Sequence, residues 1–132
     1  MAVAVCYETP TLFSRYTVTD AVAIPKGTIL ALTSENYASA ATADNDVVAG
    51  VAWMEKVASD GSTEVTAARD GMWGITAGSA ANITVGNDVV VHQLNEVTVY
   101  TSLDDEKGYV LGKSMETYAS SAPAVIKVRV NV

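Results

Sequence analysis

The sequence has few of the residues that carry reactive chemistry. Among its 132 residues are a single cysteine, Cys6, and a single histidine, His92. One cysteine forms no internal disulfide, which is typical of a protein made in a reducing compartment. His92 has neither a G-x-S-x-G elbow nor an H-E-x-x-H motif with it. We therefore expect no catalytic residues, no metal site and no cofactor, and a protein that is not an enzyme.

Long apolar runs and basic clusters are also missing. No stretch approaches the roughly 20 apolar residues that a membrane-spanning helix needs. The apolar start of the chain has no basic residue before it and is interrupted by Glu8 and Pro10, unlike a secretory signal. The net charge is −7, which repels phosphate backbones and anionic lipids. We expect a soluble protein made in a cytoplasm, with no nucleic-acid and no membrane partner.

Aromatic residues are scarce as well. They make up 7% of the chain, whereas 49% is hydrophobic, most of it valine and alanine. Small and β-branched side chains favour short, closely packed strands. Turn signals recur roughly every 8–12 residues, as in sandwiches and barrels, and no segment has a helical period. The sequence predicts an all-β fold, a small single-domain barrel or β-tulip of short strands.

Two segments, 24–30 and 83–91, share one outline. Each has an apolar residue, then a glycine three residues later, then a β-branched run. Glycine adopts positive φ without a steric penalty and so permits a sharp turn into the next strand. We predict that Gly27 and Gly86 are structural corners of the barrel.

Apolar runs between turn signals predict most of the strands. The clearest alternation is at the end of the chain, where Ile126, Val128 and Val130 share one face and Lys127 and Arg129 the other. We interpret residues 34–43 as an irregular surface loop because they are small and show no period. Further strands are predicted at 28–33, 47–54, 54–57, 63–68, 72–76, 97–100, 109–111 and 125–130.

Residues 1–19 differ from the rest of the chain. They contain no glycine and hold Tyr7, Phe13 and Tyr16, while Pro10 restricts them to extended or edge geometry. We predict an extended N-terminal arm at 1–19 and a barrel domain at 20–132, and we expect deletion of residues 1–15 to leave the barrel folded. An ordinary first strand of the barrel is an equally good interpretation.

A few residues are candidates for other roles. Lys56 lies in a Met-Glu-Lys-Val segment like that of the carrier lysine of biotinyl domains, although the hairpin tip is predicted at residues 59–61. Asp44 and Asp46, and the acidic run 104–106, are best explained as solvated turns. One of Trp53 and Trp73 is expected in the core, and the other is open to a contact between subunits.

Five segments of glycines and aliphatic residues precede the final valine-rich strand: 25–27, 46–52, 74–78, 83–89 and 108–112. Together with that strand, these segments resemble the small capsid decoration, or cement, proteins of tailed phages and prophages. The resemblance covers about residues 20–130.

The resemblance implies a virion protein on the outer surface of a phage capsid, assembled in the host cytoplasm. Such a protein bridges adjacent major capsid proteins, stabilises the shell, and often forms a homotrimer. Its N-terminal arm reaches over neighbouring subunits, and here the arm is apolar enough to add a strand to a neighbour's exposed edge. The candidate contacts with the capsid or another subunit are Val3, Val5, Tyr7, Phe13, Tyr16 and Trp73.

Two other functions fit the same composition. A binding module, for example for carbohydrate, needs an exposed aromatic platform, which Trp73, Tyr100 and Tyr109 are the candidates to form. A small hydrolase needs paired acids, for which Asp44 and Asp46 are the candidates.

Overall fold

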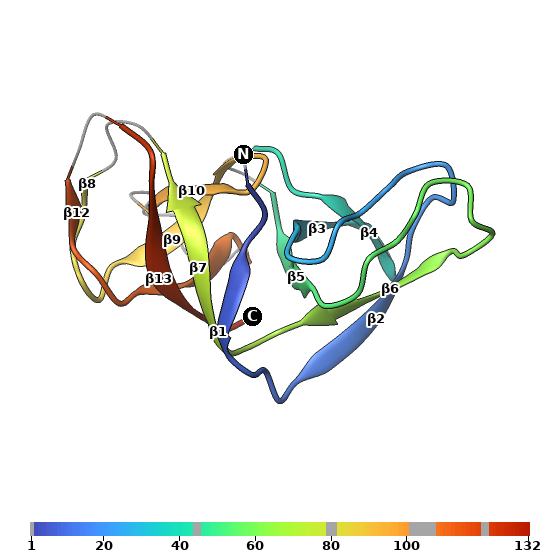
Figure 1. Cartoon of the computed structure of the whole chain (residues 1–132), viewed down its shortest axis with the longest axis horizontal. Coiled ribbons are helices and arrows are strands. Elements are labelled where there is room, and N and C mark those ends of the chain that lie inside the picture. Colours follow the sequence, from blue (N-terminus) through green and yellow to red (C-terminus); the bar gives the residue numbers. More distant parts are fainter. Residues whose placement is uncertain (1, 44–45, 79–81, 101–107, 120–121) are drawn as a thin grey trace.

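The chain folds entirely from β-strands. The computed structural model describes residues 2–43, 46–78, 82–100, 108–119 and 122–132, and these residues form strands and no helix. The predicted all-β barrel class is confirmed. Two lobes lie side by side along the long axis (Figure 1), and each lobe contains a closed ring of strands.

The first ring is a five-stranded closed barrel. Its strands are paired in the order β2-β4-β3-β5-β6. Strand β2 closes the barrel because it pairs antiparallel with β6 along its whole length and parallel with β4 at its end. The strands are β2 (Phe13–Thr17), β3 (Ile29–Ser34), β4 (Tyr37–Ala40), β5 (Val48–Ala52) and β6 (Glu64–Ala68).

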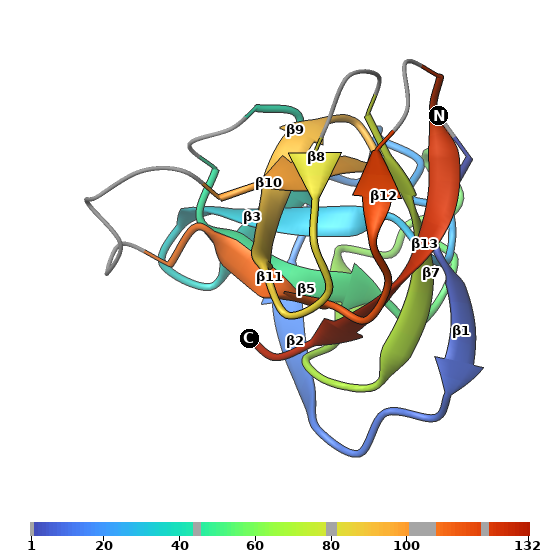
Figure 2. The same cartoon turned by 90° about the vertical axis from the view of Figure 1, so that its left-hand side faces the viewer.

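The second ring is built on β7, which pairs with β13 on one side and with both β1 and β10 on the other. The pairings run β7-β10-β9-β11-β13 and return to β7, with β1 attached outside the ring. Strands β8 (Asn82–Ile83) and β12 (Tyr118–Ala119) pair as a small separate ribbon (Figure 2). The ring strands and β1 are β1 (Val5–Glu8), β7 (Met72–Ala77), β9 (Asp88–Gln93), β10 (Glu96–Val99), β11 (Val110–Ser114) and β13 (Ala124–Val130).

Buried side chains join the two rings. The larger core cluster includes Trp73 and Ile75 of β7 together with Ile29 and Val51 of the first barrel. A second cluster fills the first barrel alone. The buried side chain of Asn95 adds a polar link, since its Oδ1 accepts a hydrogen bond from the Ile29 N–H at 3.1 Å. The rings therefore pack as one unit.

Both predicted corners have positive φ, +90° at Gly27 and +89° at Gly86. Their surroundings differ. The Ala4 N–H donates to the Gly27 carbonyl at 2.9 Å, and a side chain at position 27 would begin 2.2 Å from the Ala4 carbonyl oxygen. Nothing lies within 4 Å of the corresponding point at Gly86. Gly27 thus has no room for a side chain, whereas Gly86 has open space there and donates its N–H to the Ser114 carbonyl at 2.8 Å.

The residues predicted as an N-terminal arm are extended, but they belong to the sheets of their own chain. Val5–Glu8 pairs with β7, and Phe13–Thr17 pairs with all five residues of β6. The alternative interpretation, a first strand of the barrel, describes β2. The physical reason is the missing neighbour: β2 closes the first barrel, and without it β4 and β6 would each leave an unpaired edge.

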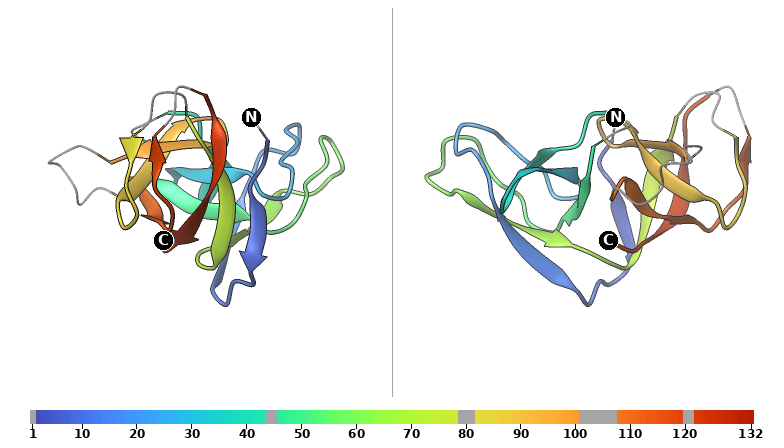
Figure 3. Two further views of the ribbon diagram at one scale, coloured as in Figure 1. Left: turned by 60° about the vertical axis from the view of Figure 1, so that its left-hand side comes forward. Right: turned by 180° about the vertical axis from the view of Figure 1, so that it is seen from behind.

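Two local predictions were wrong. Residues 37–40, interpreted as part of a loop, form β4, which pairs with β3 after a tight turn at Asn36 with φ of +60°. Residues 54–57, predicted as a strand, make one isolated bridge between Lys56 and Ile24. That segment instead starts the long connection from β5 to β6 (Figure 3).

Candidate interaction surface

The outer surface of β1, β7 and β13 is the most prominent candidate for an interaction. Strand pairing places Val5 of β1 opposite Gly74 of β7, and Gly74 opposite Lys127 of β13. Alternation along β13 points Val125, Lys127 and Arg129 outward, away from the buried Ile126. We define the β1 face by the outward side chains of these strands: Val5, Tyr7, Glu8, Val125, Lys127 and Arg129.

Large apolar side chains are exposed on this face. The exposed fractions are 56% for Val5, 55% for Tyr7 and 56% for Val125. The Tyr7 ring lies over Gly74, where a Cβ atom would be only 2.7 Å from Tyr7 Cε2. Because Gly74 has no side chain, the Tyr7 ring packs against the backbone of the sheet. More than half of the surface of Tyr7 nevertheless remains exposed.

Cations border the apolar part of the face. Lys127 Nζ is 5.9 Å from the centre of the Tyr7 ring. Arg129 forms an ion pair with Glu8, with 3.5 Å between Nη1 and Oε2, and both side chains are about half exposed. Next to this pair the surface is hollowed by a pocket of about 330 Å³, which Glu8, Gly71 and Arg129 help to line.

An aromatic cluster lies on the other side of β1. The ring centres of Phe13 and Trp53 are 5.7 Å apart, and those of Trp53 and Trp73 are 6.1 Å apart with the rings nearly perpendicular. Lys26 Nζ lies 4.2 Å from the centre of the Trp53 ring. Burial raises the pKa of the nearby Cys6 thiol, an effect that the positive charge of Lys26 partly offsets. This cluster fills the junction between the rings.

The structure separates the predicted contact residues into three groups. Val5, Tyr7 and Phe13 are exposed, and Val3 and Tyr16 are half-buried. The prediction for Trp73 was wrong, because this side chain is fully buried and its Nε1 donates to the Asp70 carbonyl at 3.1 Å. Trp73 is the core tryptophan, and Trp53 is the partly exposed one.

The β13 residues of the β1 face were not among the predicted contact residues. The clean alternation of residues 125–130 was the available signal, since it already placed Lys127 and Arg129 on one side of a strand. It did not indicate that Val5 and Tyr7 would lie beside them, because that depends on both strands pairing with β7.

Lys56 is not presented as a carrier lysine. It is 3% exposed, and its Nζ donates to the carbonyl oxygens of Asp20 at 2.7 Å and Val57 at 3.0 Å. Carboxylate oxygens of Asp20 and Asp60 each lie 3.4 Å away. Hydrogen bonds, first of all from the Ser62 N–H, lower the pKa of Asp60. The ammonium group therefore links the loop that contains Asp20 to the loop that contains Val57 and Asp60.

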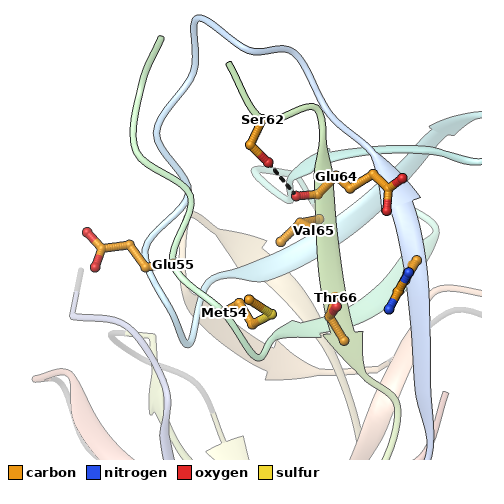
Figure 4. Close-up of a pocket in the computed structure, with 7 residues that line it drawn as sticks. Met54, Glu55, Ser62, Glu64, Val65 and Thr66 are labelled. Carbon is orange, nitrogen blue, oxygen red and sulfur yellow. Dashed lines mark hydrogen bonds between the residues drawn. The ribbon is translucent and has the colours of Figure 1, made fainter. Parts of the chain in front are cut away.

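Two acids that line a described pocket, Glu55 and Glu64, do not face each other as the paired acids of a hydrolase do. A pocket of about 250 Å³ beside β6 is lined by Glu55 and Glu64, whose carboxylates point to opposite sides (Figure 4). Asp46 Oδ2 accepts hydrogen bonds from the backbone of Thr42 and Ala43, as a turn residue does. Asp44 and the run 104–106 lie outside the described residues.

The other predicted sites are not assembled either. Of the predicted aromatic platform, Trp73 is buried and Tyr100 and Tyr109 are half-buried. Within the described ranges, no three His, Cys, Asp or Glu residues are grouped to hold a metal ion. The same ranges contain no helix long and apolar enough to cross a membrane.

No model of a known protein family matches this chain, and no curated protein matches it.

Proposed function

We propose that the chain is a structural virion protein that binds the outer surface of a phage capsid and bridges adjacent major capsid proteins. The observation that carries this proposal is the β1 face. Tyr7, Val5 and Val125 are large apolar side chains that a rigid sheet holds at the surface. Exposed apolar groups of this kind mark interaction sites, and tyrosine is enriched among the residues that dominate binding energy.

The shape of the molecule supports a role in bridging. The two rings give an elongated chain (Figure 1), so that one lobe can contact a shell subunit while the other approaches a neighbouring subunit. A homotrimer would present three copies of the β1 face at once, and modest contacts would then add through avidity. The net charge of −7 suits the outside of a shell, away from packaged DNA.

Binding to shells tests the proposal directly. The chain is mixed with particles assembled from the major capsid protein of the same genome, without decoration protein, and the particles are sedimented. We expect saturable co-sedimentation and shells that release their contents at a higher temperature. Absence of co-sedimentation at micromolar protein would contradict the proposal. Analytical ultracentrifugation of the free chain separates a trimer from a monomer.

Point substitutions locate the contact better than truncation. Deleting residues 1–15 would remove β1, which flanks the second ring, and three of the five residues of β2, which closes the first ring. Val125→Asp instead changes one exposed side chain of the β1 face, and Val57→Asp is its control, because both valines are 56% exposed. We expect Val125→Asp to weaken binding about tenfold or more and Val57→Asp to bind as the unmodified chain does.

A further inference from the structure

The β1 strand concentrates positive charge in an acidic chain. The sequence has 8 Lys and Arg residues against 15 Asp and Glu residues. Three of the basic residues border β1: Lys127 and Arg129 on the β1 face, and Lys26 on the opposite side. Of the six residues of the β1 face, the acidic one is Glu8, which pairs with Arg129. Beside the face, Glu116 Oε2 accepts a hydrogen bond from the Lys127 N–H at 3.0 Å. Three cations and two carboxylates thus surround β1, a higher share of positive charge than in the chain as a whole.

The lysine ammonium groups here are positioned by aromatic rings rather than by carboxylates. Lys26 lies over Trp53 and Lys127 lies beside Tyr7. Among the described residues, neither lysine forms an ion pair. Cation–π attraction at an exposed ring is worth only about 0.5–1 kcal/mol, so it orients an ammonium without neutralising its charge. Both groups keep the capacity to pair with an incoming carboxylate.

Arg129 is also available for exchange. Its side chain is 52% exposed and that of Glu8 is 57% exposed. Exposed ion pairs contribute little to stability, because water screens the charges and both side chains lose freedom. A partner carboxylate can thus replace or join Glu8 at the guanidinium, whose planar donors suit bidentate pairing.

The free edge of β1 is closed near its start, which favours docking on the face over addition of a strand. The Ala4 N–H donates to the Gly27 carbonyl at 2.9 Å on the side away from β7. The Lys26–Gly27 corner therefore occupies the position that an added strand would need beside Ala4. The side chains of the β1 face, in contrast, are exposed.

We propose that the β1 face binds a carboxylate-bearing protein segment, with Tyr7 as its apolar anchor and Lys127 and Arg129 as its charge partners. This inference rests on the proposed function, in which the segment belongs to a shell protein. Packing against Gly74 restricts the Tyr7 ring before binding, so less conformational entropy is lost on docking. Val5 and Val125 contact the apolar side chains that lie between the acidic residues of the partner. Complementary charge contributes to selecting the partner and increases the rate of association.

Charge reversal on the full chain tests the inference with shells. Lys127→Glu and Arg129→Glu are expected to weaken shell binding about tenfold each and to reduce its dependence on salt. Arg15→Glu is the matched control, since Arg15 is an exposed cation on β2 of the other ring. If the unmodified chain binds shells and both reversals bind equally well, the charge inference is wrong while the proposed function stands.

A model peptide tests the inference without shells. A synthetic peptide of alternating Glu and Val is titrated into the isotope-labelled chain, and a peptide of alternating Lys and Val is the comparison. We expect the acidic peptide alone to shift the NMR signals of Val5, Tyr7 and Val125. Equal shifts with both peptides, or shifts confined to other surfaces, would overturn the inference. This outcome is independent of whether shells are bound.

Discussion

The ring of Tyr7 occupies the space that a side chain at position 74 would need. A Cβ atom on Gly74 would lie 2.7 Å from Tyr7 Cε2 and 2.9 Å from the hydroxyl oxygen. Glycine in a strand costs roughly 0.5–1 kcal/mol relative to alanine, yet here it lets an exposed aromatic ring lie against the sheet. Glycine at position 74 therefore lowers the stability of the strand but allows the Tyr7 ring to pack on the sheet.

A double-mutant cycle measures the coupling between these two effects. With Tyr7 present, Gly74→Ala must displace the ring, so we expect a net change in unfolding free energy close to zero or destabilising. In a Tyr7→Ala background the space is free, and the same Gly74→Ala change should stabilise by about 0.5–1 kcal/mol. Urea unfolding of the four proteins gives the coupling energy. Additive effects would show that the ring does not depend on Gly74.

The buried Lys56 ammonium is predicted to stabilise the first barrel. Lys56→Met keeps the apolar stem but leaves the carbonyl oxygens of Asp20 and Val57 without this donor. Hydrogen bonds to charged groups contribute about 1.5–3 kcal/mol each, so we expect a loss of about 2 kcal/mol or more. Lys113→Met removes an exposed ion pair and should cost less than about 1 kcal/mol. Equal losses in urea unfolding would contradict the structural role of Lys56.

The two glycine corners are expected to respond differently to alanine. Both have φ near +90°, so backbone strain should cost about 1–2 kcal/mol in each case. Gly86→Ala meets nothing further within 4 Å, whereas Gly27→Ala brings a Cβ to 2.2 Å from the Ala4 carbonyl oxygen. Backbone cannot rotate away as a side chain can, so Gly27→Ala should cost about 3 kcal/mol or more. Similar melting temperatures for the two variants would argue against the close approach.

Local sequence signals predicted the turns and most strands of this fold. Gly27 and Gly86 could be recognised because a sharp turn requires positive φ, and glycine adopts positive φ without a steric penalty. The pattern of 125–130 predicted β13 because alternate residues face core and solvent. Strand β4 was missed, since residues 37–40 are mostly small and only Ala38 of them is buried, which gives weak alternation.

Long-range pairing could not be predicted in the same way. The two rings exist because β7 pairs with β13 and β10, and because β2 pairs with β6, and no local pattern specifies these partners. The candidate surface depends on the same pairings: Tyr7, Gly74 and Lys127 are far apart in sequence and meet only through the register of β7 with its neighbours. The burial of Trp73 likewise follows from the ring that closes around it.

Asp70 gives a prediction for the dependence of stability on pH. Its Oδ1 accepts hydrogen bonds from the backbone of Thr11 at 2.7 Å and of Leu12 at 3.0 Å, and Oδ2 accepts from Thr11 Oγ1 at 2.6 Å. These bonds, with that from Leu12 as the largest contribution, lower the pKa of Asp70 in the folded chain. They also fix the link between β1 and β2, and so help to hold β1 in place.

The lowered pKa of Asp70 determines how the free energy of unfolding changes with pH. An unfolded aspartate titrates near about 3.9, so the folded state binds fewer protons at Asp70 than the unfolded state as pH falls below that value. The stabilisation is then present above about pH 4 and lost as pH falls through the folded pKa. Asp70→Asn should destabilise most at neutral pH, and its deficit relative to the unmodified chain should shrink in acid. Thr11→Val acts through the same ionised carboxylate, so its smaller deficit should shrink over the same range. Urea unfolding between pH 7 and pH 3 measures both differences, and a deficit that does not change with pH would show that the charge of Asp70 is not what holds residues 11 and 12.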